Sequence, residues 1–294
     1  MPLLSIIIPT HNRQELLKKA IESALVQTLQ EIEIIVIDDG SREPATCSIK
    51  DPRVFIHRHA SPRGAAAARN KGIQVANSAH LCFLDDDDTL DPAYASTMLD
   101  FMGSYSAEID FAWPTLRVFN VATGETSKAQ NHTCLIKRNR PATEESYAAS
   151  AYTRTTGMMF KTETLRMFGG FDETLTVSED RELVFRMLSK GCGCGSVNAS
   201  LVNFFIHPGP RLSTNENLVL QAQCDALIAD RHADFIAKHP KLASRYLNLL
   251  ARRQKDAGLH TEHQDTLLRL LKITPFDIRA LKRLVFSSVK RKRS

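Results

Sequence analysis

The N-terminal part of the chain alternates short, largely apolar runs with segments whose apolar side chains recur at helical spacing. Residues 3–9, an apolar and β-branched run, and residues 32–37 and 79–84 predict buried strands, and residues 54–59 predict a further strand. One helix is predicted by the spacing of Leu16, Leu17, Ala20, Ile21, Ala24 and Leu25, and a second by the alanine-rich segment 65–76. This alternation predicts an α/β fold with a parallel sheet.

Beyond residue 110 the pattern is less regular. The further elements expected here are strands at 111–121, 155–160 and 200–207 and helices at 161–168 and 180–190. From residue 217 onward the sequence predicts helix almost throughout, with breaks at Pro240 and Pro275. We therefore expect an α/β domain over residues 1–214 and a helical region with a basic end over residues 215–294.

Two helix starts carry capping signals. Asn12 precedes the first helix and Glu15 stands three residues later, which is the pattern of a capping box. Asp91 followed by Pro92 predicts another helix start, with the aspartate as N-cap and the proline as first helical residue.

Polar clusters follow three of the predicted strands. They are Pro9-Thr10-His11-Asn12, Asp38-Asp39-Gly40-Ser41 and the four aspartates Asp85 to Asp88. Parallel α/β sheets bind ligands at the carboxyl ends of their strands, so these clusters predict one shared cleft. No Gly-x-Gly-x-x-Gly or Gly-Lys-Ser/Thr loop is present, so neither dinucleotide nor P-loop binding is supported.

The aspartate run after a buried strand carries an electrostatic cost, because four adjacent carboxylates repel one another. A divalent cation would offset this repulsion, and carboxylate clusters suit hard ions such as Mg²⁺ and Mn²⁺. The alternative is a solvated acidic turn that caps the next helix.

Composition limits the function classes. The chain has 294 residues, of which 43% are hydrophobic and 24% charged, as in ordinary globular proteins. No apolar stretch is long enough to span a membrane, and the N-terminus does not resemble a signal peptide. Six scattered cysteines favour reduced thiols and a cytoplasmic location.

The net charge of +5 comes from the C-terminal end. Seven basic residues and no acidic ones follow Asp277, and they leave 31 basic against 33 acidic residues in the rest of the chain. A near-neutral body argues against nucleic-acid binding.

Six segments together resemble the family 2 glycosyltransferases, over about residues 3–213. They are Ser5-Ile-Ile-Ile-Pro-Thr-His-Asn-Arg13, Val36-Ile-Asp-Asp-Gly-Ser41, Gly64 with Ala-Ala-Arg69-Asn70-Lys-Gly72, Phe83-Leu-Asp-Asp-Asp-Asp88, Gly169-Gly-Phe-Asp172 and Ser178-Glu-Asp180. The resemblance implies a GT-A fold, a Rossmann-like nucleotide-binding sheet with flanking helices, to which the C-terminal helices are an appendage. It implies metal-dependent, inverting transfer of a sugar from a nucleoside diphosphate sugar, UDP-sugar favoured, to an acceptor hydroxyl.

The resemblance assigns roles to the aspartate run. Asp87 is expected to bind Mn²⁺ or Mg²⁺, and Asp85 to help position ribose or water. Asp86 takes the variable position of the motif and is counted with the donor-binding residues. Asp88 is either a further site residue or a partner of the backbone at the next helix start.

Other donor contacts follow from the same resemblance. Asp38 and Asp39 match an aspartate pair that reads the base, and a carboxylate can accept the imide N–H of uracil. The loop beside base and ribose matches Pro9, Thr10 and Asn12, although Asn12 has the capping alternative given above. Arg69 is expected near the diphosphate or the acidic cluster, or else as a buried ion-pair partner of Asp38 or Asp85.

The second half of the site is expected after residue 175. Asp180 matches the general base that takes the proton of the acceptor hydroxyl, and its alternative is a helix N-cap. His207 is expected near the metal or the diphosphate, and Arg211 near a phosphate.

The resemblance also bears on partners. It implies a saccharide or lipid-linked saccharide acceptor in surface polysaccharide or glycolipid assembly. The basic segment 267–289 is either an interfacial helix, placing the protein peripherally at the inner membrane face, or a helix packed on the catalytic domain. A nucleotidyltransferase of similar fold and a non-catalytic nucleotide-sugar binder stay open as alternatives.

Overall fold

The computed structural model describes residues 1–46, 50–128, 134–139, 154–208 and 217–291, with side chains as far as residue 285. The chain separates into two compact units. The first comprises residues 1–174 and 179–208, and the second residues 175–178 and 209–294. Each unit is described by itself below.

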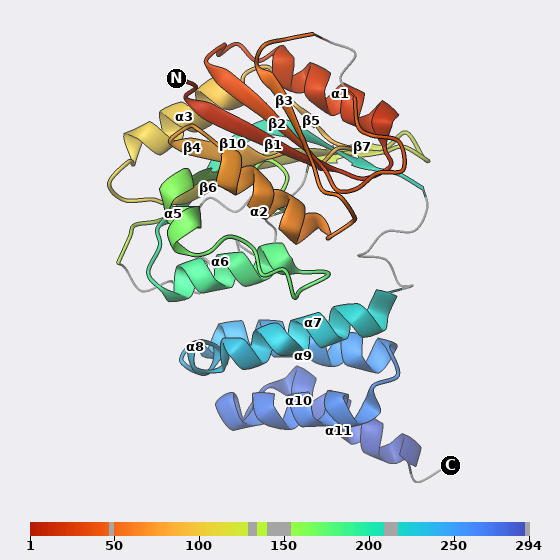
Figure 1. The fold of residues 1–294 in the computed structure, drawn as a ribbon. Helices are drawn as coiled ribbons and strands as arrows, with labels where there is room; N and C mark the ends of the chain where they lie inside the picture. The colour runs from red at the N-terminus through yellow and green to blue at the C-terminus, as the bar shows by residue number, and fades with distance from the viewer. Residues whose placement is uncertain (47–49, 129–133, 140–153, 209–216, 292–294) are drawn as a thin grey trace. The chain divides into compact units, whose positions relative to one another are not determined.

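A mixed sheet forms the centre of the first unit (Figure 1). Its strand order is β3-β2-β1-β4-β9-β6-β10-β5, with β7 paired to β6 and β8 to β10. The strands are β1 (Leu4–Thr10), β2 (Ile32–Asp38), β3 (Val54–Arg58), β4 (His80–Phe83), β5 (Thr89–Leu90), β6 (Phe111–Asn120), β7 (Thr126–Lys128), β8 (Leu135–Ile136), β9 (Met159–Lys161) and β10 (Cys194–Ile206). The first four strands are parallel, as predicted, and β9 is antiparallel to both of its neighbours.

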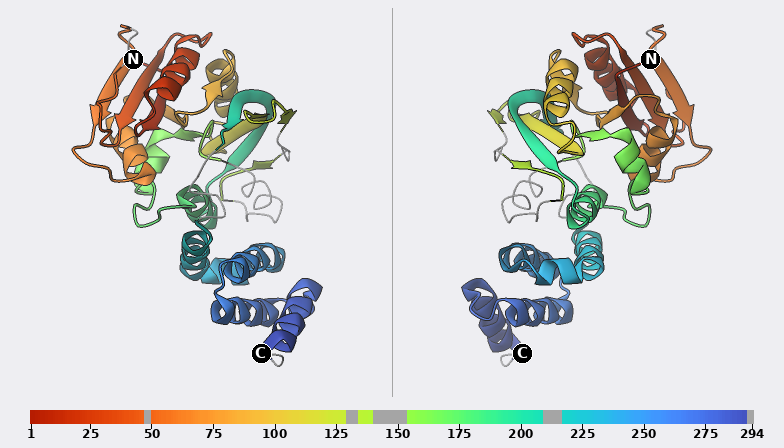
Figure 2. Two further views of the ribbon diagram at one scale, coloured as in Figure 1. Left: turned by 90° about the vertical axis from the view of Figure 1, so that its right-hand side faces the viewer. Right: turned by 90° about the vertical axis from the view of Figure 1, so that its left-hand side faces the viewer.

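Helices cover both faces of this sheet (Figure 2). The helices of the first unit are α1 (Gln14–Leu25), α2 (Ala65–Val75), α3 (Tyr94–Ser104), α5 (Thr162–Met167) and α6 (Glu179–Ser189). Buried side chains of α1 and α3 share one apolar core with Leu4, Ile6 and Ile8 of β1. Helix α2 packs on the opposite face. It approaches β1 closely at Gly72, where a Cβ would lie 2.4 Å from Cγ2 of Ile7.

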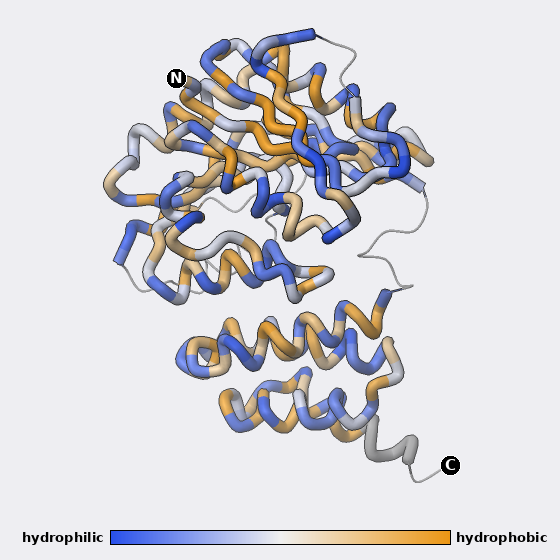
Figure 3. The backbone as a smooth tube through the Cα atoms, in the orientation of Figure 1, coloured by the Kyte–Doolittle hydropathy of each residue, from blue (hydrophilic) through white to orange (hydrophobic). Residues whose placement is uncertain are grey.

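The central strands β1 and β2 are buried on both faces and are mostly apolar, as the colours of Figure 3 show. Every strand and helix expected in the first unit is present, with ends shifted by a few residues. The exception in length is the last strand, which begins at Cys194 rather than at residue 200. Five cysteines in the described residues are buried and free.

Both predicted helix caps are wrong. Arg13 occupies the N-cap of α1 and no side chain caps that helix. The Asn12 side chain instead accepts a hydrogen bond from the Arg42 backbone N–H at 2.8 Å, and Asn12 has a left-handed φ of 57°. At the other start, α3 begins only at Tyr94, because Asp91 forms a turn with the Ala93 N–H.

The second unit is helical, as predicted. It contains α7 (Leu218–Arg231), α8 (Ala233–Ala237), α9 (Pro240–Asp256), α10 (His260–Ile273) and α11 (Ile278–Arg291). Helix α9 packs on α7, α8 and α10. Pro240 stands in the first turn of α9 and Pro275 separates α10 from α11, so both predicted breaks are confirmed. Over the described part of the chain, every helix is too short or too polar to cross a bilayer.

Candidate active site

The four aspartates form a tight turn after β4, closed by a hydrogen bond from the Asp88 N–H to the Asp85 carbonyl at 3.0 Å. Their exposure alternates. Asp86 and Asp88 are buried, whereas the side chains of Asp85 and Asp87 keep 30% and 20% of their accessible surface. The turn therefore exposes Asp85 and Asp87, for which a donor and a metal role are expected, and buries Asp86, which is also counted with the donor-binding residues, together with Asp88.

Asp86 joins the turn to the end of β1. Its carboxylate accepts hydrogen bonds from the Thr10 hydroxyl at 2.7 Å and from Arg13 at 3.1 Å. Burial raises the pKa of Asp86 to about 6, although the Thr10 hydrogen bond and the Arg13 charge oppose this rise. The same guanidinium lies 3.2 Å from Asp87, so Arg13 spans two adjacent carboxylates.

Asp88 holds the turn against β10. Its Oδ1 accepts the backbone N–H of Phe205 at 2.9 Å, so the interpretation that Asp88 binds the start of the next helix is wrong. Burial, followed by the charge of Asp85, raises the pKa of Asp88 to about 8. Among the residues that the structure describes, its buried Oδ2 has no hydrogen-bond partner, and neither has Nε2 of His207, directly after β10.

Arg69 connects the acidic turn with the segment that holds the candidate base. The guanidinium donates to Asp85 at 2.8 Å and to Glu179 at 2.6 Å, and it lies over the Phe171 ring at 5.6 Å. Burial alone would lower the pKa of Arg69, but the charges of Asp85 and Glu179 raise it above its ordinary value. Of the roles considered for this residue, the buried ion pair with Asp85 is present.

Asp180 follows Glu179 in the first turn of α6 and is half-buried. Its Oδ1 accepts the N–H of Arg181 at 2.7 Å. Because α6 begins at Glu179, Asp180 lies inside the helix rather than at the position before it.

Asp38 and Asp39 organise two loops at the end of β2. Asp38 accepts the N–H groups of Ser41 at 2.8 Å and Ala45 at 2.9 Å, and it pairs with Arg58. Burial alone would raise the pKa of Asp38, but these hydrogen bonds lower it overall.

Asp39 acts on the following loop. It accepts the backbone N–H groups of Arg63 and Gly64 at 2.9 and 2.7 Å and bonds Nδ1 of His59 at 2.8 Å. The two neighbouring carboxylates are therefore both buried and both bound to the backbone of the loops that follow β2 and β3.

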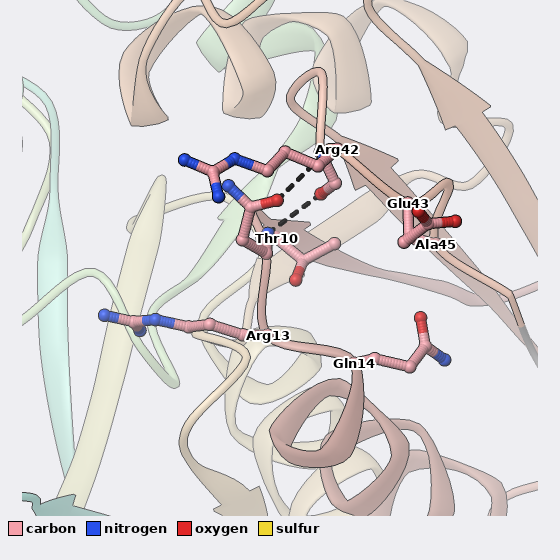
Figure 4. Close-up of a pocket in the computed structure, with 8 residues that line it drawn as sticks. Thr10, Arg13, Gln14, Arg42, Glu43 and Ala45 are labelled. Carbon is pink, nitrogen blue, oxygen red and sulfur yellow. Dashed lines mark hydrogen bonds between the residues drawn. The ribbon is translucent and has the colours of Figure 1, made fainter.

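A hollow of about 350 Å³ lies at the carboxyl ends of β1 and β2 (Figure 4). Its wall combines the loop after β1 with the loop after β2. The lining residues are Thr10, Asn12, Arg13, Gln14, Ser41, Arg42, Glu43 and Ala45. Two hydrogen bonds join the loops, from the Asn12 N–H to the Ser41 hydroxyl and from the Arg42 N–H to the Asn12 side chain. Pro9 lies just before this hollow in β1, half-buried.

Three expected site residues are thus gathered around the acidic turn, namely Thr10, Arg69 and Asp86, and Asp180 is tied to it through Glu179. Arg211 lies outside the described residues. Sequence reasoning missed Arg13 and Glu179, each of which forms an ion pair in the site. The available signals were their positions, since Arg13 ends the first family segment and Glu179 directly precedes Asp180.

Among the side chains that the structure describes, no three histidines, cysteines or acidic residues converge as a ready-made metal cage. Such a cage is not required for a nucleotide-bound Mg²⁺, which takes one or two carboxylates and completes its shell with phosphate oxygens and water. The partly exposed carboxylates of Asp85 and Asp87 fit this pattern. No hydrogen bond or ion pair among the described residues joins His207 to them, so its metal role stays a prediction.

Comparison with solved structures identifies the class of fold. The chain matches the crystal structure of S. aureus TarS 1–349 in complex with UDP-GlcNAc with a TM-score of 0.62. The two sequences are 15% identical, and the match covers 99% of this chain and 92% of TarS 1–349. At this identity the likeness establishes the fold alone, the GT-A fold of glycosyltransferases.

The family follows from the sequence. The profile of Glycosyl transferase family 2 matches residues 5–171, which is more than half of the chain. The chain belongs to this family, as its motifs predicted.

Several relatives match part of the chain. An uncharacterized glycosyltransferase of Haemophilus influenzae is 40% identical over 107 residues, 35% of this chain and 43% of the relative. The pre-mycofactocin glycosyltransferase of Mycobacterium tuberculosis is 28% identical over 199 residues, 64% of this chain and 39% of the relative. An Escherichia coli enzyme named UDP-Glc:alpha-D-GlcNAc-diphosphoundecaprenol beta-1,3-glucosyltransferase is 37% identical over 105 residues, 35% of this chain and 42% of the relative. The chain thus spans about two fifths of the length of these relatives.

Proposed function

We propose that this glycosyltransferase moves a sugar from a UDP-sugar to an acceptor hydroxyl, with inversion at the anomeric carbon. The observation that carries the proposal is the bridge through Arg69. One buried guanidinium binds Asp85 of the acidic turn and Glu179, the residue before Asp180. A donor-binding group and a candidate base are thereby held at one place in the first unit, although 95 positions separate Asp85 from Asp180 in the sequence.

The donor nucleotide would occupy the hollow at the ends of β1 and β2. Its wall supplies amide, hydroxyl and guanidinium groups from Asn12, Ser41 and Arg42. UDP is favoured because S. aureus TarS was crystallised with UDP-GlcNAc and the E. coli relative is named for UDP-Glc. In this proposal Asp38 and Asp39 shape the base-binding loops by accepting hydrogen bonds from backbone N–H groups. The carboxylate lone pairs that these bonds leave free would accept hydrogen bonds from the base.

Asp87, with His207, would hold Mn²⁺ or Mg²⁺ against the donor diphosphate. The cation, when bound, supplies charge that stabilises the departing diphosphate. Arg13 already places positive charge beside Asp87, and Arg69 places it beside Asp85. Both guanidiniums would orient the acidic turn and limit its repulsion while the donor is absent.

Asp180 would accept the proton of the acceptor hydroxyl as that oxygen attacks the anomeric carbon. It lies in the first turn of α6, at the positive end of the helix dipole. Glu179 does not compete for this role, because Arg69 holds it by a 2.6 Å hydrogen bond.

The acceptor in this proposal is a saccharide carried on a lipid, in the assembly of a surface polysaccharide or glycolipid. The support is the name of the E. coli relative, whose acceptor is a diphosphoundecaprenol-linked sugar. The enzyme would then work at the inner membrane face, in peripheral contact with the bilayer.

Binding and turnover test separate parts of the proposal. UDP with Mn²⁺ should raise the melting temperature of the native protein by mass action, and dTDP and GDP should raise it less. Asp180→Asn should keep the UDP shift but lower donor turnover about 10²- to 10⁴-fold, the usual contribution of a general base. Asp100→Asn, at an exposed carboxylate on α3, is the matched control. No shift with any nucleotide would reject the donor assignment, and full turnover in Asp180→Asn would reject the base.

A further inference from the structure

Helix α11 exposes apolar side chains along one side. Ile278, Leu281 and Val285 recur at positions i, i+3 and i+7 and are 67%, 41% and 61% exposed. Phe276, in the short connection before the helix, is 91% exposed. We call these four residues the α11 apolar stripe. Exposed apolar side chains grouped in this way mark an interaction surface more often than isolated ones do.

The other side of α11 is already occupied. Ala280 is fully buried, and its N–H bonds Oδ1 of Asp277 at 2.9 Å. Asp277 in turn accepts a hydrogen bond from the Asn248 side chain of α9 at 3.1 Å, and Arg283 donates to the Asn248 carbonyl at 2.8 Å. Helix α11 therefore packs on α10 and reaches α9 through these polar contacts, and it leaves the α11 apolar stripe exposed.

This arrangement reverses the usual one, in which a surface helix buries its apolar side and exposes its polar side. Packing within the second unit buries Ala280 but leaves the α11 apolar stripe exposed. The alternative given for the basic segment, a helix packed on the catalytic domain, stays a prediction. The stripe lacks an occupant among the described residues of its own unit, since its side chains stay exposed.

The charge of the segment indicates what the occupant is. Exposed Arg279 and Lys282 flank the stripe, and the seven basic residues after Asp277 have no acidic residue among them. A second copy of this chain would bring like charge against like, whereas a negatively charged surface would be attracted. A surface that accepts apolar side chains and also attracts cations is an anionic lipid bilayer.

We infer that the α11 apolar stripe docks on an anionic membrane. Phe276 and the three helical side chains enter the boundary between headgroups and acyl chains, and Arg279 and Lys282 stay at the headgroup level beside lipid phosphates. The inference deepens the proposed function, because it names the surface that would bring the enzyme to a lipid-linked acceptor.

Vesicle sedimentation with the full chain tests the inference. Binding to vesicles of equal parts phosphatidylglycerol and phosphatidylcholine should exceed binding to pure phosphatidylcholine at least ~10-fold, because each basic residue near an anionic surface contributes about a factor of five. The double variant Phe276→Ser, Val285→Ser should bind anionic vesicles more weakly by about tenfold or more. The reason is that two apolar side chains that the wild type buries in the membrane are absent. Met167→Ser, at a 72% exposed residue of α5, is the matched control.

Several results would overturn the inference. These are equal binding to both kinds of vesicle, unchanged binding by the double variant, or an equal loss in Met167→Ser. Self-association in sedimentation velocity that the double variant abolishes, without vesicle binding, would assign the stripe to a second copy instead. The UDP-induced melting shift, measured on the same variants, should not change, so failure of this inference is distinguishable from failure of the donor assignment.

Discussion

Replacing Arg69 by methionine tests the bridge that connects the two halves of the site. Methionine keeps much of the side-chain volume and removes the positive charge. The change leaves Glu179 buried without a cation and leaves Asp85 next to three other carboxylates. A lysine could not restore the bridge, because it lacks the planar fork that reaches both carboxylates.

The expected cost follows from burial. Removing one partner of a buried ion pair destabilises proteins by roughly 3–5 kcal/mol. The Asp85 side chain is 30% exposed and gains water when it is released, so the low end of that range, about 3 kcal/mol, applies. Turnover should fall about 100-fold as well, since Glu179 no longer fixes the neighbouring Asp180 and small misplacements have effects of that size.

The pH dependence gives a signature that simple misfolding would not. Burial already raises the pKa of Glu179, and Arg69 opposes that rise. In Arg69→Met the folded-state pKa rises further, so the folded variant binds a proton more readily than the unfolded chain does. Stability from such a group is present at low pH and is lost as the pH rises through the folded pKa. The deficit of the variant relative to the wild type should therefore shrink as the pH falls.

Urea unfolding at pH 8 and pH 5 measures this deficit. The control is Arg252→Met on α9, where an exposed pair with Asp256 spans 4.0 Å and contributes at most about 1 kcal/mol. The reasoning is refuted if Arg69→Met unfolds like Arg252→Met at pH 8, or if its deficit grows as the pH falls.

Two further predictions concern the sheet. Gly193→Ala should destabilise the protein by about 3 kcal/mol or more, because its Cβ would lie 1.9 Å from the Glu108 carbonyl oxygen. Its control is Gly103→Ala in α3, which has open space around it and should raise stability by roughly 0.5–1 kcal/mol. The midpoints of urea unfolding distinguish the two variants. Tyr94→Phe should lose about 1–3 kcal/mol in the same assay, because the buried Gly157 carbonyl loses the hydroxyl that bonds it at 2.9 Å, and an unchanged midpoint would contradict this.

The parallel strands and the acidic turn could be predicted from sequence because their signals are local. Strands β1 and β2 are buried on both faces and are therefore mostly apolar in sequence, and the polar residues at their ends follow at once in the chain. The ion pairs of the site could not be predicted in this way. Arg13 meets Asp86 across 73 positions and Arg69 meets Glu179 across 110, so only the folded chain brings them together.

The predicted cap of α1 failed for the same physical reason. Asn12 and Glu15 satisfy the local rule for a capping box, but the Asn12 side chain bonds the Arg42 N–H from a loop 30 positions away. This tertiary bond joins the two loops that line the hollow at the ends of β1 and β2. A residue that follows a local rule in the sequence can thus serve the site instead, and the left-handed φ of Asn12 is consistent with that use.

The acidic turn shows how the fold offsets the repulsion that four adjacent aspartates create. Asp86 and Asp88 point inward and bind neighbouring strands, which fixes the turn. Each of the two outward aspartates has an arginine: Asp85 has Arg69, and Asp87 has Arg13. These arginines differ in freedom, because the Arg69 side chain is 7% exposed and the Arg13 side chain 48%. Arg13 can move into solvent and release Asp87 to another cation, whereas Arg69 is held between two carboxylates. The difference in burial therefore favours Asp87 over Asp85 as the residue that exchanges its partner.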